Sequence, residues 1–221
     1  MSRPIVAIDG PAGAGKSTVA KGVAQKLGYL YIDTGAMYRA IAWKILQAGV
    51  PISDEQAVIQ QAMRTEVTLA TIDGEQHVYA DGEDVSQAIR TPEATRASSP
   101  VSAIAGVRKR LVDLQRKMAS DGGVVMEGRD IGTVVFPNAE VKIFLTASAE
   151  ERARRRVEQM KALGMEADVE KVAAEMRERD LRDSSRATAP LVQAADAVLV
   201  DTDGLTVEQV IDKIVSIAGS R

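Results

Sequence analysis

Residues 10–18 of the chain read GPAGAGKST and match the phosphate-binding pattern GxxxxGK[ST]. Glycines let the backbone turn tightly and direct successive N–H groups toward an anion, and a helix that begins near Lys16 adds the positive end of its dipole. We expect Lys16 to reach the β- and γ-phosphates of a nucleoside triphosphate. The Ser17 hydroxyl is expected to join the oxygen shell of a Mg²⁺ ion.

The sequence on either side of this loop supports the match. Residues 5–8 form a short apolar run, which predicts a buried parallel strand before the loop. Val19, Val23 and Leu27 then recur at helical spacing after it. The strand–loop–helix order favours a phosphate-binding loop over a glycine-rich turn that binds nothing.

Composition limits the other possibilities. The chain has 221 residues, of which 45% are hydrophobic and only 3% aromatic, so aliphatic side chains must fill the core. A net charge of −3 argues against general affinity for nucleic acids or membranes. Cysteine is absent, which excludes disulfides and thiol chemistry. No apolar run approaches ~20 residues and no signal peptide precedes the first strand, so we expect a cytoplasmic protein.

Strand and helix patterns alternate along the chain, which predicts an α/β fold with a parallel sheet. The five expected core strands are 5–8, 29–32, 124–126, 141–145 and 197–200. The expected helices follow the phosphate loop and lie at about 35–47, 101–118, 149–163, 169–182 and 207–217. Residues 66–85 instead alternate apolar and polar side chains around two Asp-Gly turns, which predicts two or three antiparallel strands in a small insert.

Polar clusters follow the second and third core strands, where ligands of such sheets bind. Asp33, Thr34 and Arg39 come after the second strand, and an arginine there suits a phosphate. The alternative is that Asp33 or Thr34 only caps the next helix. Glu127 directly follows the third strand and is a candidate Mg²⁺ ligand. Arg129 comes two residues later, and the alternative for it is an ion pair with the neighbouring aspartate.

A third cluster lies near the end of the helix predicted at 169–182. Arg179 and Arg186 lie at the two ends of this cluster. Arginines on a mobile segment can close over phosphates and exclude water. Gly164 separates the two arginine-rich helices, and a glycine at this position suits a hinge. The alternative is a solvated, charged helix face, which accounts for some of these arginines.

Taken in order, the phosphate loop, DTGAMYR, EGRDIGTVVFP and ERDLRDSSRATAP resemble the bacterial cytidylate kinases over nearly the whole chain. The resemblance implies a P-loop three-layer fold with a five-stranded parallel sheet. A core at 1–50 and 100–221 would include a helical lid at about 150–186, and residues 51–99 would form a nucleoside monophosphate-binding insert. It also implies direct in-line transfer of the γ-phosphate of ATP to CMP or dCMP, with Mg²⁺, by a cytoplasmic monomer that binds neither nucleic acid nor membrane.

The resemblance assigns roles to residues of this chain. ATP would be bound by Gly10, Pro11, Ala12, Gly13, Ala14, Gly15, Lys16, Ser17 and Thr18. The acceptor nucleotide would be bound by Thr34, Arg39, Ser99, Arg108, Arg129, Asp130, Arg179 and Asp183. Lys16, Arg129 and Arg186 would be catalytic, and Ser17 and Glu127 would bind the metal. Ser98 and Ser102 lie close to Ser99 and are the alternatives for that position.

Three other functions compete with this one. A P-loop kinase for UMP or a non-nucleotide alcohol should lack the Arg108 and Asp130 pair. A GTP-dependent switch needs an NKxD motif after a strand, and the sequence has none. A nucleic-acid-dependent ATPase should carry a basic stripe, which the negative net charge disfavours.

Overall fold

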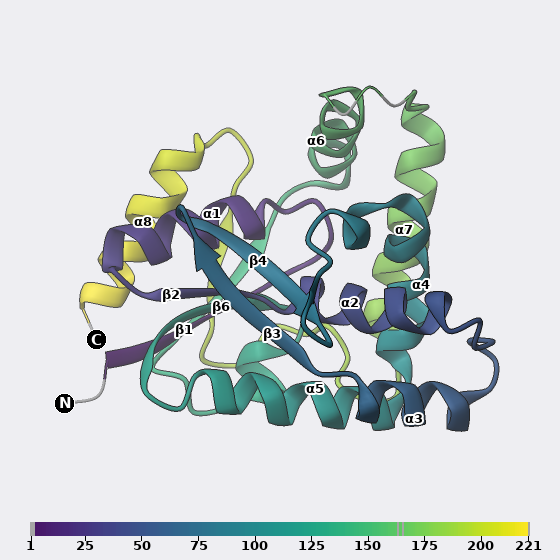
Figure 1. Cartoon of the computed structure of the whole chain (residues 1–221). Helices are drawn as coiled ribbons and strands as arrows, with labels where there is room; N and C mark the ends of the chain where they lie inside the picture. The colour runs from purple at the N-terminus through teal and green to yellow at the C-terminus, as the bar shows by residue number, and fades with distance from the viewer. Residues whose placement is uncertain (1–2, 163, 165, 221) are drawn as a thin grey trace. The chain divides into compact units, whose positions relative to one another are not determined.

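The computed structural model describes residues 3–162, 164 and 166–220 (Figure 1). The chain divides into two compact units. The first unit comprises Met1–Tyr31 and Asp121–Arg221, and the second comprises Ile32–Ser120. Each unit buries its own set of aliphatic side chains.

A five-stranded sheet with the strand order β2-β6-β1-β7-β8 forms the core of the first unit. β1 pairs in parallel with β6 and β7, and β7 pairs in parallel with β8. This confirms the predicted parallel sheet. The strands are β1 (Arg3–Asp9), β2 (Leu30–Asp33), β6 (Gly122–Gly128), β7 (Val141–Thr146) and β8 (Val198–Asp201).

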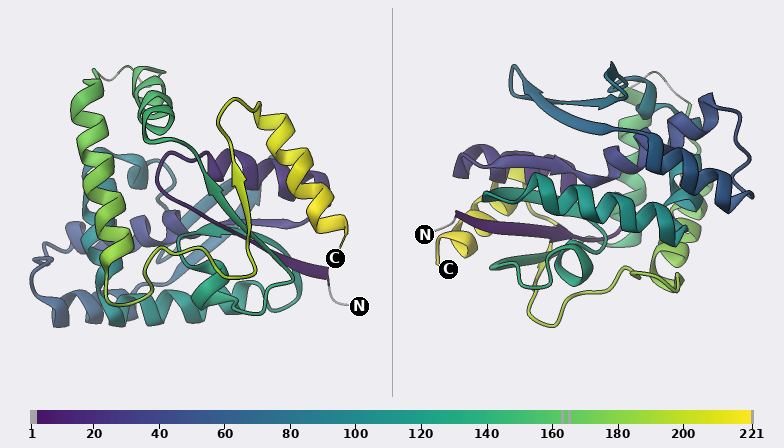
Figure 2. Two further views of the ribbon diagram at one scale, coloured as in Figure 1. Left: turned by 180° about the vertical axis from the view of Figure 1, so that it is seen from behind. Right: turned by 60° about the horizontal axis from the view of Figure 1, so that its bottom comes forward.

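Two helices pack against this sheet and against each other (Figure 2). They are α1 (Lys16–Leu27) and α8 (Val207–Gly219). Val19 and Val23 of α1 and Ile211 and Ile214 of α8 join one buried cluster with aliphatic residues of β1, β6, β7 and β8. The aliphatic core expected from the low aromatic content is therefore present, and it holds the start of α1 beside the end of β1.

The remaining helices of the first unit are α6 (Ala149–Ala162), α7 (Val169–Ser185) and the short π-helical turn η2 (Ile131–Val135). α6 and α7 pack on each other and stand side by side in Figure 1. Both were predicted, although residue 163, expected to end α6, lies outside the described residues. Gly164 has a φ of 72°, which suits the predicted chain break, and its two neighbours are likewise outside the described residues.

The second unit combines a small antiparallel sheet with helices. Its sheet has the order β3-β4-β5 and both pairings are antiparallel, as the alternating pattern predicted. Asp73-Gly74 and Asp81-Gly82 both have positive φ values, as turns of this kind require. The elements are α2 (Thr34–Gln47), α3 (Glu55–Arg64), β3 (Val67–Ile72), β4 (Glu75–Ala80), β5 (Glu83–Asp84), η1 (Ala88–Arg90), α4 (Pro92–Ala103) and α5 (Ala105–Met118).

The sequence pattern predicted only some of the helices in the second unit. The helix expected at 101–118 is divided at Ile104, which caps both α4 and α5. α4 begins at Pro92, nine residues before the predicted start at 101, because the Thr91 hydroxyl accepts a hydrogen bond from the Ala94 N–H over 3.3 Å and Pro92 occupies the first turn. α3 was not predicted. The domain limits at 51 and 99 remain a prediction.

Among the described residues, no helix has the length and apolar character needed to cross a bilayer.

Candidate functional site

The phosphate-binding loop connects β1 to α1 in the first unit, so its glycines and Lys16 lie where the pattern predicted. Gly10 has a φ of 153°, and a Cβ atom there would lie 2.0 Å from the backbone oxygen of Leu145. Only glycine fits this close approach between the loop and β7. Gly13 and Gly15 also have positive φ values, and α1 begins at Lys16. Ser17 and Thr18 are exposed in the first turn of α1.

Lys16 is buried, with only 6% of its surface exposed, and its Nζ donates a hydrogen bond to the Pro11 carbonyl over 2.7 Å. Burial lowers the pKa of Lys16 to about 7, and the nearby positive charges of Arg129 and Arg179 act in the same direction. The carboxylates of Glu127 and Asp9 oppose this shift. A bound polyanion would stabilise the charged form of Lys16, because negatively charged phosphate oxygens favour the protonated amine.

Contacts of Arg129 and Arg186 connect the end of β6 with α7 and the segment after it. Arg129 Nε donates a hydrogen bond to Asp183 Oδ2 over 2.9 Å. Arg186 Nη2 lies 3.7 Å from Asp130 Oδ1. The alternative of an ion pair between Arg129 and its neighbour Asp130 is therefore not what the structure shows. Arg129, Arg179 and Glu127 lie close enough to Lys16 to shift its pKa, so these three predicted site residues lie near the phosphate loop.

Glu127, the predicted metal ligand, is buried at the end of β6 and accepts a hydrogen bond from the Tyr31 hydroxyl over 2.6 Å. The described residues contain no group of three His, Cys, Asp or Glu side chains that could bind a metal by themselves. Mg²⁺ does not need such a group, because it is commonly bound by one or two protein oxygens together with substrate phosphates. The carboxylate of Glu127 and the hydroxyl of Ser17 fit that donor chemistry.

In the second unit, the DTGAMYR segment forms the start of α2. Asp33 Oδ1 accepts a hydrogen bond from the Ala36 N–H over 2.9 Å and so caps the helix. Asp33 Oδ2 also accepts a hydrogen bond from Arg39 Nη2 over 3.0 Å. The capping alternative is thus confirmed for Asp33, whereas Thr34 is the buried first residue of the helix. The same carboxylate that caps α2 orients the Arg39 guanidinium.

Arg108 and Ser99 lie in neighbouring helices of the second unit. The Arg108 guanidinium lies 5.5 Å from the centre of the Tyr38 ring, and its Nη1 donates to the Ser102 carbonyl over 3.1 Å. The hydroxyls of Ser98 and Ser102 each donate to the carbonyl three residues earlier, over 2.8 Å. Ser99 is buried within this turn of α4. The assignment of Ser99 to the acceptor stays a prediction.

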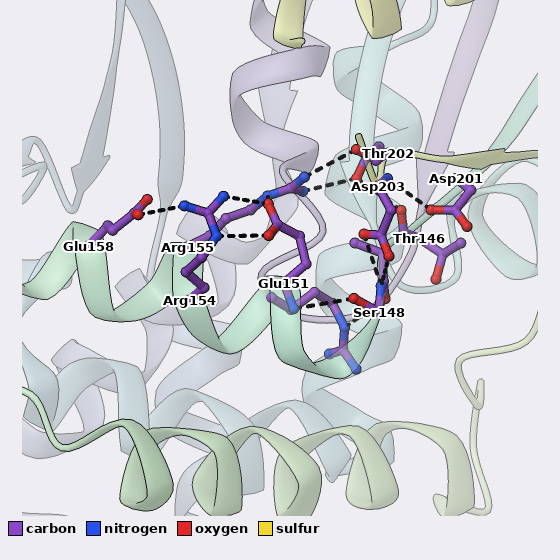
Figure 3. A network of polar contacts seen from close by, with 11 residues as sticks. Thr146, Ser148, Glu151, Arg154, Arg155, Glu158, Asp201, Thr202 and Asp203 are labelled. Carbon is purple, nitrogen blue, oxygen red and sulfur yellow. Dashed lines mark hydrogen bonds and ion pairs between the residues drawn. The ribbon is translucent and has the colours of Figure 1, made fainter. Parts of the chain in front are cut away.

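Two arginines of α6, Arg154 and Arg155, form ion pairs within the helix, as the alternative of a solvated, charged helix face predicted (Figure 3). Arg154 pairs with Glu151 and Glu158 on the exposed face of the helix. Arg155 binds Glu151 and also reaches Thr202 after β8, where Nη1 donates to the hydroxyl over 2.9 Å and Nη2 to the carbonyl over 3.2 Å. These contacts attach α6 to the sheet, and they account for the charge of these two arginines without a ligand.

Two residues that the sequence did not single out also belong to this part of the structure. Arg152 of α6 donates to the Ala12 carbonyl of the phosphate loop over 3.0 Å and forms an ion pair with Asp180 of α7. Asp9, the last residue of β1, binds two backbone N–H groups of η2. Arg152 lies in a helix with many other charged residues, and Asp9 is a single acidic residue at the end of a strand. The sequence therefore contains no local pattern that distinguishes either residue from its neighbours.

Comparison with known proteins agrees with these motifs. The family model described as Cytidylate kinase matches residues 6–220. The chain is 56% identical to a cytidylate kinase from Desulforamulus reducens, with 96% of this chain and 95% of that protein covered. It is 54% identical to a bifunctional pantoate ligase/cytidylate kinase from Synechococcus sp. strain JA-3-3Ab, but spans only 40% of that protein's length.

Solved structures with low sequence identity share the fold. A shikimate kinase from Bacteroides thetaiotaomicron has a TM-score of 0.52 at 12% identity, with 98% of both chains covered. An uncharacterized protein from Eubacterium ventriosum has a TM-score of 0.55 at 14% identity, with 99% of both chains covered. At these identities the comparison shows that the chain has the P-loop kinase fold and does not identify its acceptor.

Proposed function

Because the chain belongs to the cytidylate kinase family, we propose that it transfers the γ-phosphate of ATP to CMP or dCMP, which yields ADP and CDP or dCDP. The observation that carries this proposal is the set of positive side chains around the phosphate loop of the first unit. Lys16, Arg129 and Arg179 are close enough for the two arginines to lower the pKa of the lysine. Such a set stabilises the negative charge that spreads over the oxygens of a transferring phosphoryl group.

On the donor side, the loop N–H groups from Gly10 to Thr18 would bind the phosphates of ATP, and Lys16 would exchange its bond to the Pro11 carbonyl for the β- and γ-phosphates. Mg²⁺ would be bound by Ser17 and Glu127 together with phosphate oxygens, and would neutralise charge on the transferring group. Arg186 would stabilise the same charge from the segment after α7.

The acceptor nucleotide would be bound by residues with the following roles. In the first unit, Arg129 would bind the acceptor phosphate, and Arg179 and Asp183 would bind the sugar. In the second unit, Arg39 would bind the acceptor phosphate, since Asp33 already orients its guanidinium. The buried Thr34 would contribute its hydroxyl near the same phosphate.

The base would be recognised by Asp130, Arg108 and Ser99. The exocyclic amino group of cytosine is a donor that the carboxylate of Asp130 can accept, while O2 and N3 are acceptors for Arg108 and Ser99. Uracil presents a carbonyl in place of that amino group, and an unsatisfied buried group costs about 1–3 kcal/mol, more when charged. Asp130 is buried, so the full penalty applies, and UMP should be a poor substrate.

The location and assembly of the protein are also proposals. The family works on small nucleotides, and the chain carries a net charge of −3. We infer a cytoplasmic monomer that binds neither nucleic acid nor membrane. Light scattering of the purified protein would contradict the monomer if it gave the mass of a dimer.

The acceptor is tested by measuring kcat/KM with ATP against CMP, dCMP, UMP and AMP. We expect CMP and dCMP to exceed UMP and AMP by at least about tenfold, in line with the penalty for an unpaired buried group. Lys16→Met should abolish turnover with each acceptor. A preference for UMP or AMP would overturn the proposal, as would activity in Lys16→Met.

A further inference from the structure

Asp9 is a buried carboxylate outside the phosphate-loop motif, and only 5% of its surface is exposed. Its Oδ1 accepts a hydrogen bond from the Ile131 N–H and its Oδ2 accepts one from the Gly132 N–H, both over 2.8 Å. Asp9 ends β1, directly before Gly10, whereas Ile131 and Gly132 open η2, directly after Asp130. One side chain thus connects the base of the phosphate loop to the segment that carries Asp130.

The two N–H groups that Asp9 binds are those that a helical turn leaves without partners at its start. An aspartate directly before such a turn ordinarily accepts a hydrogen bond from the N–H of the second or third residue of the turn with its own side chain. Asp130 occupies that position, but its side chain makes no capping bond. Its backbone carbonyl accepts from Val134 and Val135, and its carboxylate lies 3.7 Å from Arg186. Asp9 therefore provides the cap that Asp130 would otherwise provide.

The surroundings of Asp9 fix its position. Its backbone lies between Gly128 of β6 and Phe144 of β7 in the parallel sheet. A Cβ atom on Gly132 would lie 3.4 Å from Asp9 Oδ2 and 3.2 Å from Lys142 Cδ, so the turn and the carboxylate are closely packed. A shift of Asp9 would move the start of η2, and with it the backbone of Asp130.

We propose that Asp9 is a positioning residue for acceptor recognition: by capping η2 from β1, it fixes the position of the Asp130 backbone, and with it the carboxylate that would bind the base of the acceptor nucleotide. This inference rests on the proposed function, because it assumes that Asp130 distinguishes CMP from UMP. Burial raises the pKa of Asp9 to about 6, and the two N–H groups oppose that shift, so they favour the ionised carboxylate that the cap requires.

A purely structural role for Asp9 predicts something different. If the carboxylate only stabilised the first unit, its loss would lower thermal stability and reduce turnover with CMP and UMP in the same proportion. If it positions Asp130, its loss would reduce the preference for CMP over UMP, and most of the effect would lie in KM for CMP. The ratio of kcat/KM for the two acceptors therefore separates the two roles.

The test uses Asp9→Asn, which keeps the size of the side chain but directs an amide N–H at one of the two backbone N–H groups. We expect kcat/KM for CMP to fall by about 10- to 100-fold, as is typical when a group that orients a site residue is removed, and the CMP preference to fall with it. KM for ATP should change by less than about threefold, well below that range. In the Asp130→Ala background, Asp9→Asn should not change the acceptor preference further.

Asp168→Asn is the matched control, because Asp168 Oδ1 likewise accepts hydrogen bonds from two backbone N–H groups, those of Glu170 and Lys171, but at the start of α7. It should lower the melting temperature and leave the CMP preference intact. If Asp9→Asn does not fold, Gly132→Ala decides the question, because its added methyl group crowds the same contact. A reduced CMP preference in that variant would support the proposal.

An unchanged CMP preference in Asp9→Asn, or in Gly132→Ala where the first variant does not fold, would overturn the positioning role. Failure of the proposed function would give a different result. In that case the unmodified protein itself would show no preference for CMP over UMP, before any variant is compared.

Discussion

Arg129 and Asp183, which lie 54 residues apart in the sequence, form a hydrogen-bonded ion pair in the first unit, with 2.9 Å between Nε and Oδ2. The pair connects the end of β6 to α7, and only 8% of the Asp183 side chain is exposed. The proposed function assigns Arg129 to the acceptor phosphate and Asp183 to its sugar. Each of these two groups therefore also orients the other.

Asp183→Asn should destabilise the protein in the absence of nucleotide. The substitution leaves the Arg129 guanidinium, which is 19% exposed, without its charged partner. We expect the free energy of unfolding to fall by about 1–3 kcal/mol, measured by urea denaturation. A double-mutant cycle with Arg129→Gln should show that the two losses are not additive. Strict additivity would contradict a direct interaction between the two side chains.

Asp130→Ala should damage use of the acceptor more than binding of ATP. The carboxylate is the proposed partner of the cytosine amino group, so we expect kcat/KM for CMP to fall by about tenfold or more and the CMP-to-UMP ratio to approach one. Steady-state kinetics with both acceptors measure this ratio. Asp113→Asn, which alters an exposed i,i+4 pair with Lys109, is the control and should leave the ratio as it is. An unchanged ratio in Asp130→Ala would remove Asp130 from base recognition.

Binding of ATP should be accompanied by uptake of a proton at pH 8. Burial and the neighbouring arginines lower the pKa of Lys16 to about 7, so most of the free protein carries the neutral amine at that pH. Negative phosphates favour the charged amine and raise its pKa, which draws a proton from the buffer. Calorimetric titrations of ATP in two buffers with different ionisation enthalpies measure this uptake. Lys16→Arg stays charged and should lose it; equal uptake in both proteins would contradict the assignment to Lys16.

Gly10→Ala should be far more damaging than Gly28→Ala. Both glycines have positive φ, but a Cβ atom on Gly28 meets nothing within 4 Å, whereas one on Gly10 would lie 2.0 Å from the Leu145 backbone oxygen. The change at Gly28 should cost about 1–2 kcal/mol of backbone strain. The change at Gly10 should cost about 1–3 kcal/mol more and abolish ATP binding. Urea denaturation and ATP titration measure the two effects, and similar losses at both positions would refute the close packing of the loop on β7.

Much of the fold could be predicted because its signals are local. The apolar runs that became β1, β7 and β8 are short and bounded by polar residues, as buried parallel strands are. The Asp-Gly turns identified the antiparallel sheet of the second unit. The helix α3 was missed because it is short: it has ten residues, of which only Val58 and Ala62 are buried. Most of α4 was missed as well. The start of α4 depends on capping by Thr91 and Pro92, and a proline within the helix obscures its pattern.

The site residues divide in a similar way. The proximity of Arg129 to Lys16 could be predicted, because both lie in motifs that directly follow strands. The role of Asp130 stays a prediction. The cap that Asp9 provides could not be predicted, since the N–H groups it binds are 122 and 123 residues away in the sequence. The same holds for Arg152, whose contact with Ala12 spans 140 residues. Interactions over such distances leave no local pattern, so only the folded chain reveals them.

The most direct test of the proposed reaction follows the transferred phosphate. ATP labelled in its γ-phosphate is incubated with CMP, Mg²⁺ and the protein, and the products are separated and counted. The account predicts that the label appears in the β-phosphate of CDP, with one CDP formed for each ADP and no transfer by Lys16→Met. Label that is found in inorganic phosphate instead of CDP would contradict it.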